Sequence, residues 1–77
     1  MNQQANISDP IIILRLKEVM ARTGLSRSTI YGKLDSNSTQ YDPDFPSPLK
    51  LGRLSVGYVQ SELNSWIQMM INKRDLK

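Results

Sequence analysis

The sequence contains no cysteine and no histidine. The absence of cysteine excludes disulfide bonds, zinc sites built from thiolates and iron–sulfur clusters. The absence of histidine removes the side chain that most often binds metals and most often acts as a general base. We therefore expect no metal, no cofactor and no catalytic residue, and the composition indicates a protein that is not an enzyme.

The sequence also lacks a long apolar segment, since its longest apolar run is Ile11–Leu14. Such a run is far too short to span a bilayer. Residues 1–6 contain no basic side chain, so the N-terminus does not have the pattern of a signal peptide. We expect a cytoplasmic protein with no membrane partner.

A length of 77 residues allows one small domain with a small core. Residues 1–10 are polar and end in Asp9-Pro10, which predicts a disordered lead-in, and residues 11–77 then form the folded domain. Lys and Arg outnumber Asp and Glu by 10 to 7, so the formal net charge is +3 and the pI is near 9.5. This balance permits a polyanionic partner without requiring one.

The first half of the domain has the pattern of two short helices. Ile11–Leu14 is rich in β-branched residues and forms either a short strand or an extended arm that plugs the core. Leu16–Thr23 has helical periodicity, and Gly24 ends that helix because glycine tolerates the left-handed conformation. Ser26 is a good N-cap for a second helix over Arg27–Leu34. Two such helices joined by a tight turn form a helix-turn-helix.

The second half begins with a loop and a hairpin. Residues Asp35–Pro48 contain three prolines and one strong apolar anchor, Phe45. Leu49–Leu51 and Leu54–Val56 alternate as strands do, and Gly52-Arg53 between them predicts a two-residue type II′ turn. A two-stranded hairpin is not stable alone, so we expect it to pack on the helices.

A longer amphipathic helix is predicted over about Tyr58–Asn72. Its apolar positions recur at steps of three and four and are Val59, Leu63, Trp66, Ile67, Met70 and Ile71. Trp66 lies within this stripe, which predicts a core residue and argues against a wedge inserted into a ligand. The fold class is therefore α+β, a small winged helix-turn-helix with two short helices, a two-stranded wing and a C-terminal amphipathic helix.

Four separated motifs resemble the AlpA family of prophage-associated transcriptional regulators, which are related to phage excisionases and to MerR-type DNA-binding domains. The motifs occur in the family's order over roughly residues 13–71 and are Arg15-Leu16-Lys17-Glu18-Val19, Thr23-Gly24-Leu25-Ser26-Arg27-Ser28-Thr29-Ile30-Tyr31, Phe45-Pro46-Ser47-Pro48-Leu49-Lys50-Leu51-Gly52, and Val56-Gly57-Tyr58 followed by Glu62 and Trp66. The resemblance implies that the helix at Ser26–Leu34 enters the major groove of DNA. It implies that the wing at Lys50–Val56 touches the backbone or the minor groove.

The same resemblance implies one of two roles on double-stranded DNA. The first is transcriptional activation of prophage genes, and the second is excisionase activity, in which a recombination directionality factor promotes prophage excision. RNA polymerase or an integrase is the implied protein partner, and the protein is a monomer in solution or assembles cooperatively on DNA. The implied location is the bacterial cytoplasm, at the nucleoid. The alternative from another class is a protein-interaction module that inhibits a regulator or an integrase without touching DNA.

The sequence departs from the family pattern at three places. Gly32 stands where the family often has a longer basic side chain, so a phosphate contact is lost or the helix backbone approaches DNA closely. Leu54 stands where the family usually carries its wing charge, and Arg53 lies one residue earlier. The loop after the second helix is longer than in the family's shortest members, and its carboxylates are expected to set turns and not to bind metal.

Charge supports DNA binding independently of the resemblance. Residues 15–34 carry five Lys or Arg and one Glu, a local net charge of +4. Phosphate contacts from such cations supply most non-specific affinity, although a solvated surface would also be basic. The candidate DNA-binding residues are Arg15, Lys17, Ser26, Arg27, Ser28, Thr29, Tyr31, Lys33, Lys50 and Arg53.

Within this set, Arg27 and Ser28 begin the second helix, where side chains best reach base edges. Arginine pairs with guanine, and serine bonds to several bases. The simpler alternative is that Arg27 touches only phosphate and Ser28 only supports the helix start. Ser26 is expected to act first as a cap, and Tyr31 is expected chiefly to pack its ring against the core edge.

Overall fold

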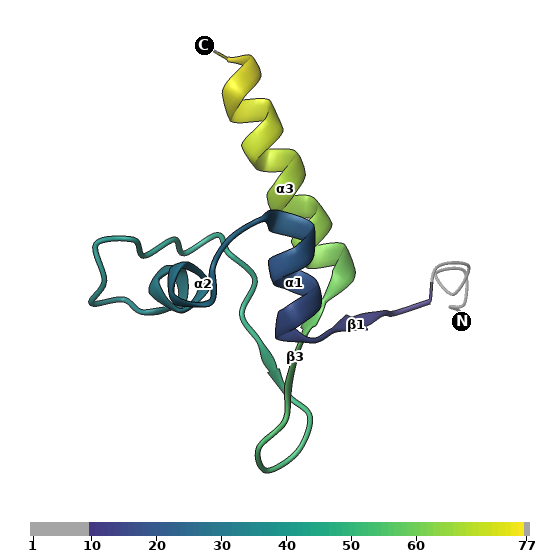
Figure 1. Ribbon diagram of the computed structural model, residues 1–77. Coiled ribbons are helices and arrows are strands. Elements are labelled where there is room, and N and C mark those ends of the chain that lie inside the picture. Colours follow the sequence, from purple (N-terminus) through teal and green to yellow (C-terminus); the bar gives the residue numbers. More distant parts are fainter. Residues whose placement is uncertain (1–9, 77) are drawn as a thin grey trace.

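A computed structural model describes residues 10–76. The predicted lead-in, residues 1–10, therefore lies outside the described residues except for Pro10. The elements, in chain order, are β1 (Ile13–Leu14), α1 (Leu16–Thr23), α2 (Arg27–Leu34), β2 (Leu49–Lys50), β3 (Val56–Val59) and α3 (Gln60–Asp75). In Figure 1, α1 and α3 lie side by side, α2 lies to one side of them, and the loop between β2 and β3 projects from the opposite end to the tip of α3. Among the described residues, no helix is both long and apolar enough to span a bilayer.

The segment Ile11–Leu14, for which the sequence left a strand and an extended arm open, contains a short strand at Ile13–Leu14. β1 pairs antiparallel with β3, with Leu14 opposite Tyr58, and β2 pairs antiparallel with the other edge of β3. The sheet order is therefore β1-β3-β2. β3 lies in the middle, so the wing is continuous with the strand that enters α3.

The bounds predicted for the two short helices are confirmed. Gly24 follows α1 with φ 74°, and its N–H donates to the carbonyl of Met20 at 2.8 Å. A positive φ of this size is readily adopted by glycine and strained for other residues, so Gly24 sets the turn between α1 and α2.

The predicted type II′ turn is wrong. That turn requires a positive φ at Gly52, and within residues 10–76 only Gly24 has one. Lys50 pairs with Val56, which places Leu51 opposite Ser55 and leaves three residues, 52–54, in the turn. The N–H groups of Leu51 and Gly52 both donate to the Ser55 carbonyl, at 2.8 and 3.3 Å.

The predicted start of the last helix is also wrong. Tyr58 and Val59 belong to β3, because their backbones pair with β1, and α3 begins at Gln60. Tyr58 is 1% exposed, so its side chain is core even though it is not helical. At the other end α3 continues beyond Asn72 to Asp75, and the positive charges of Lys73 and Arg74 favour this helix terminus.

The core contains Leu14, Val19, Ile30, Phe45, Tyr58, Leu63 and Trp66. Every element except β2 supplies at least one of these residues, and Phe45 comes from the long loop. The predicted stripe on α3 enters this core at Leu63 and Trp66, is half-buried at Ile67 and Met70, and is exposed at Ile71. The last turns of α3 therefore extend past the core (Figure 1).

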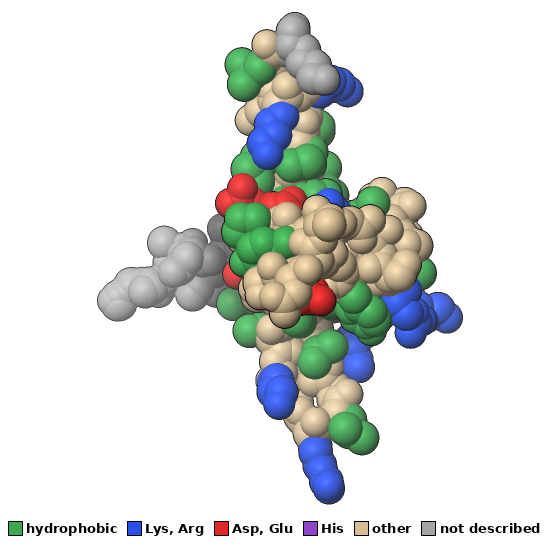
Figure 2. Space-filling view, turned by 90° about the vertical axis from the view of Figure 1, so that its left-hand side faces the viewer, with side chains coloured by type: hydrophobic (Ala, Val, Ile, Leu, Met, Phe, Trp, Pro, Cys, Tyr) green, Lys and Arg blue, Asp and Glu red, His purple; other side chains and the backbone are tan. Residues whose placement is uncertain are grey.

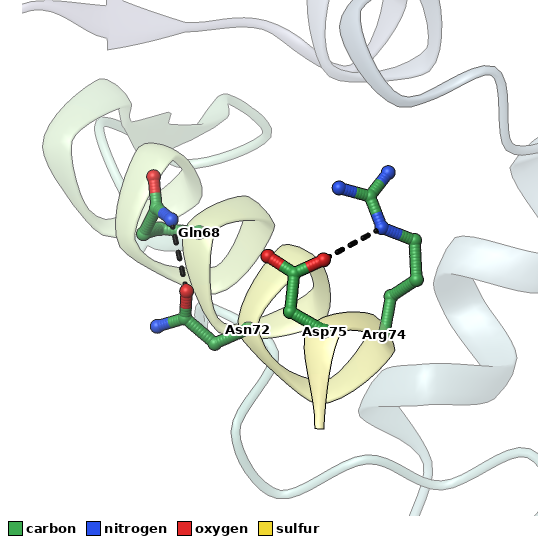
Figure 3. Close-up of polar contacts among 4 residues, drawn as sticks. All are labelled: Gln68, Asn72, Arg74 and Asp75. Atoms are coloured by element: carbon green, nitrogen blue, oxygen red, sulfur yellow. Dashed lines mark hydrogen bonds and ion pairs between the residues drawn. The ribbon is translucent and has the colours of Figure 1, made fainter. Parts of the chain in front are cut away.

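The projecting end of α3 carries its own polar contacts (Figure 3). Gln68 Nε2 donates to Asn72 Oδ1 at 3.1 Å, one turn further along the helix. Arg74 Nε pairs with Asp75 Oδ1 at 3.1 Å. Both contacts are exposed, so each stabilises this end of the helix only slightly.

Trp66 joins α3 to the long loop that follows α2. Its indole Nε1 donates to Asp42 Oδ2 at 2.9 Å, and its ring makes an edge-to-face contact with Phe45, with centroids 4.9 Å apart. The backbone N–H of Asp42 in turn donates to the carbonyl of Lys33 in α2, at 3.0 Å. One buried tryptophan thus fixes the loop and, through it, the end of α2.

The contacts of Asp42 favour its ionised form. Partial burial raises the pKa of the Asp42 carboxyl, but the hydrogen bonds from Trp66 and from the Asp44 backbone lower it, and the charges of Lys33 and Lys73 lower it further. The net pKa lies below the usual value of 3.8. The Trp66–Asp42 hydrogen bond is therefore a charge-assisted bond at neutral pH.

A Trp66→Ala variant should lose about 3–5 kcal/mol of unfolding free energy, the range for truncation of a large buried aromatic residue. A domain of this size has little more stability than that to lose, so the variant should be largely unfolded at physiological temperature. Urea unfolding followed by circular dichroism measures the loss. A Trp66→Phe variant, which keeps a ring beside Phe45, should lose less. A stably folded Trp66→Ala protein would contradict the assignment of Trp66 to the core.

Acidification should weaken the same contact. Because the folded pKa of Asp42 is below its unfolded value, this carboxylate contributes stability above about pH 4, and the contribution disappears as pH falls through the folded pKa. Asp42→Asn cannot make this contribution. The difference in unfolding free energy between the native protein and Asp42→Asn should therefore shrink as pH falls below 3.8. Urea titrations at a series of pH values check this, and a constant difference would contradict it.

Candidate nucleic-acid interface

The start of α2 is organised by Ser26. Its Oγ accepts a hydrogen bond from the backbone N–H of Thr29 at 3.2 Å and donates to Thr29 Oγ1 at 2.9 Å. The Oγ of Ser28 lies 3.3 Å from the Oγ of Ser26. The predicted cap is confirmed, and it leaves the first-turn side chain of Arg27 exposed.

Three candidate residues share one exposed face of α2. Arg27, Ser28 and Tyr31 are all exposed, and Ser28 and Tyr31 follow Arg27 by one and four residues, which places the three side chains on one side of the helix. Thr29 is half-buried beside the cap. This face offers a guanidinium, a hydroxyl and a phenol, groups that hydrogen-bond to phosphates and to base edges.

Tyr31 lies at the border between this face and the core. Burial raises the pKa of the Tyr58 phenol, and the neighbouring Tyr31 raises it further. Half of the Tyr31 side chain, 50%, stays exposed. Such a side chain can pack and still offer its hydroxyl to a ligand.

Lys33 lies on the other side of α2. Its side chain is half-buried, and its Nζ lies 5.5 Å from the centre of the Trp66 ring. The same charge lowers the pKa of Asp42. A DNA contact by Lys33 stays a prediction, and the structure brings its ammonium group to Trp66 and not to Arg27 and Ser28.

The long loop that follows α2 occupies the space where a side chain at position 32 would project. A Cβ added to Gly32 would lie 3.3 Å from both the Cβ of Gln40 and the Oγ of Ser38, and it would clash with Gln40 Oε1. The Cβ side of Gly32 therefore faces the loop, and a close approach of DNA to the helix backbone here stays a prediction. Gly32 and the longer loop are one feature, because the missing side chain makes room for the loop.

The carboxylates of that loop include two that set turns. Asp35 Oδ1 accepts from the N–H of Asn37, and Asp42 Oδ1 accepts from the N–H of Asp44, both at 2.9 Å. These are the local contacts expected of aspartate in turns. Between residues 10 and 76, no three acidic side chains come together in a group able to hold a metal ion.

The cations of α1 do not all lie in one place. Arg15 and Lys17 are exposed at the start of the helix, where the Arg15 N–H donates to Glu18 Oε1 at 2.8 Å. Arg22, in the last turn, donates instead to Asn64 Oδ1 on α3. Among the cations that give the local charge of +4 counted from the sequence, Arg22 is thus directed to α3 and Lys33 to the Trp66 ring. The sequence contains no local signal for the Arg22 contact, because its partner is 42 positions away.

The wing supplies a second basic surface. Lys50 in β2 and Arg53 in the turn are exposed, and Leu54 beside Arg53 is 93% exposed. Leu54 therefore does not turn inward to the core. Figure 2 shows basic side chains on the wing and along the edge of the molecule above it, with the carboxylates gathered nearer the middle.

Comparisons with known proteins identify relatives along most of this chain. The family model described as "Prophage CP4-57 regulatory protein (AlpA)" matches residues 12–71. The chain is 40% identical over 62 residues to the "DNA-binding transcriptional activator AlpA" of Escherichia coli (strain K12), a match that covers 80% of this chain and 89% of that protein. It is 39% identical over 54 residues to the "Uncharacterized protein ORF88" of Enterobacteria phage P4, covering 70% of this chain and 54% of that protein. No solved structure matches significantly.

Proposed function

This chain belongs to the AlpA family of prophage regulatory proteins, and we propose that it regulates prophage genes by binding duplex DNA. The observation that carries this function is the 40% identity to a protein named as a DNA-binding transcriptional activator, over 89% of that protein's length. The family match, residues 12–71, includes β1, α1, α2, the wing and most of α3. The function is thus drawn from the whole domain and not from one motif.

In the proposed complex, α2 enters the major groove. Arg27 reads a guanine edge through two hydrogen bonds, and Ser28 bonds to a neighbouring base. Tyr31 donates its hydroxyl to a phosphate from the same face. This assignment is supported by the exposure of all three side chains on one side of a capped helix.

The remaining candidates position the domain through the backbone. Arg15 and Lys17 contact phosphates from the start of α1, and Lys50 and Arg53 contact the backbone or the minor groove from the wing. Ser26 and Thr29 add hydroxyls at the helix start. Lys33 contributes only if it leaves the Trp66 ring.

The proposed activity is binding, without catalysis or a cofactor, at prophage DNA in the bacterial cytoplasm. We favour transcriptional activation, with RNA polymerase as the protein partner, because the named relative is an activator. The excisionase alternative requires an integrase partner, and stimulation of integrase-catalysed excision by the purified protein distinguishes it from activation. Both roles are compatible with a monomer in solution or with cooperative assembly on DNA.

Arg27→Ala should weaken binding to a preferred duplex by about 1–3 kcal/mol and relax specificity at one or two base positions. Lys33→Ala is the matched control on the same helix, because its ammonium group lies at the Trp66 ring. It should alter base preference much less. Selection of duplexes from a random pool, followed by binding titrations, measures both effects. If Arg27→Ala retains native affinity and base preference with an intact circular dichroism spectrum, α2 does not read the sequence in this way.

A salt series tests DNA binding itself and the wing together. The native protein should bind duplex DNA with an affinity that falls as salt rises, whereas a module that binds only proteins should show no such binding. Lys50→Ala/Arg53→Ala should weaken preferred and random duplexes about equally. Each lost phosphate contact lowers the slope of log affinity against log salt by about 0.9, so this slope should fall by roughly 1–2. An unchanged slope would exclude the wing and direct attention to Lys73 and Arg74 at the end of α3.

A further inference from the structure

The wing ends in an exposed leucine. Leu54 has the largest exposed fraction, 93%, of the large hydrophobic side chains in residues 10–76. Its neighbours on the wing are also partly exposed, with Leu51 at 48% and Val56 at 39%. An apolar side chain at the tip of a projecting hairpin gains nothing from the domain's own core, so its burial depends on a ligand.

The position of Leu54 is set by the backbone of the turn. The Ser55 carbonyl accepts hydrogen bonds from the N–H groups of both Leu51 and Gly52, which closes the three-residue turn. The paired strands behind the turn join β2 to β3, and β3 is also paired with β1. The tip is therefore carried by the three-stranded sheet, and the loop between β2 and β3 projects away from the helices (Figure 1).

The charges around Leu54 select the kind of ligand. Arg53 is adjacent in the turn, Lys50 lies on the strand that leads to it, and no acidic residue occurs between Asp44 and Glu62. The tip thus combines positive charge with a leading apolar group. Duplex DNA offers the matching pair of surfaces, since phosphates border the minor groove and stacked bases lie at its floor.

Resting on the proposed DNA-binding function, we propose that Leu54 is a wedge that enters the minor groove and partly separates two stacked base pairs. Apolar wedges of this size kink DNA toward the major groove. Arg53 and Lys50 hold the phosphates on either side, while α2 occupies the adjacent major groove. The wing then bends DNA as well as positioning the domain. Steps that unstack easily, such as TA and CA, are favoured at the insertion point.

The test measures DNA bending by energy transfer between dyes on the two ends of a duplex that the native protein selects from a random pool. The native complex should bend this duplex by about 20–90°. The Leu54→Ala complex should be close to straight. The affinity of Leu54→Ala for the duplex should fall by less than about tenfold. The variant loses the contact between the leucine and the bases, but it also no longer has to separate two stacked base pairs. Leu54→Met, which keeps a long apolar side chain, should retain most of the bend.

Leu76→Ala is the matched control, because Leu76 is 85% exposed but lies at the end of α3. It should bend DNA as the native protein does. A native bend in the Leu54→Ala complex, or no bend in the native complex, overturns the wedge while leaving DNA binding in place. The first result would leave Leu54 available for a protein partner. Failure of the native protein to select any duplex removes the proposed function, and the wedge with it.

Discussion

The hydrogen bond from Trp66 to Asp42 ties the C-terminal helix to the long loop, and through that loop to α2. Trp66 belongs to α3, and Asp42 belongs to the loop that follows α2. The Asp42 backbone bonds to the end of α2, and Phe45 from the same loop packs against the indole ring. The position of α2 on the body of the protein therefore depends on this aromatic pair and this charge-assisted hydrogen bond, together with the fully buried side chain of Ile30.

The same constraint accounts for the composition of α2. The loop returns over one side of the helix, where a Cβ on Gly32 would meet Gln40 and Ser38, and Lys33 Nζ lies 5.5 Å from the centre of the Trp66 ring. The Arg27, Ser28 and Tyr31 side chains remain on the exposed side. Glycine in a helix costs about 1 kcal/mol relative to alanine, and at this position it leaves space that the loop side chains occupy. The proposed recognition surface is thus narrow and is concentrated in the first turns of α2.

The sequence correctly predicted those features of the fold that depend on residues close together in the chain. The Ser26 cap, the Gly24 turn and the bounds of α1 and α2 follow from hydrogen bonds and backbone preferences within a few positions, and periodicity identified Trp66 and Leu63 as core. The errors came from pairing between distant segments. Tyr58 looked helical by its spacing but is held in a strand by Leu14, and the wing turn follows from the register of β2 with β3.

The candidate site shows the same division. The sequence placed Arg27 and Ser28 at the start of the second helix and predicted that Tyr31 packs chiefly against the core edge, and the structure leaves all three side chains exposed. Spacing could not predict that Arg22 reaches Asn64, that Lys33 lies over Trp66, or that Leu54 stays in solvent at the wing tip. These placements depend on α3, on the long loop and on strand register. They decide which of the sequence's cations are available to a ligand.

The central claim is that α2 and the wing together form one DNA-binding surface and that the projecting end of α3 does not. Nuclear magnetic resonance of the ¹⁵N-labelled protein, titrated with a duplex that it selects, tests this most directly. The amide signals of Arg27, Ser28 and Tyr31 and those of the wing turn at 52–54 should shift together, while signals from 68–75 stay in place. Shifts confined to the end of α3, with α2 and the wing unperturbed, would contradict the account.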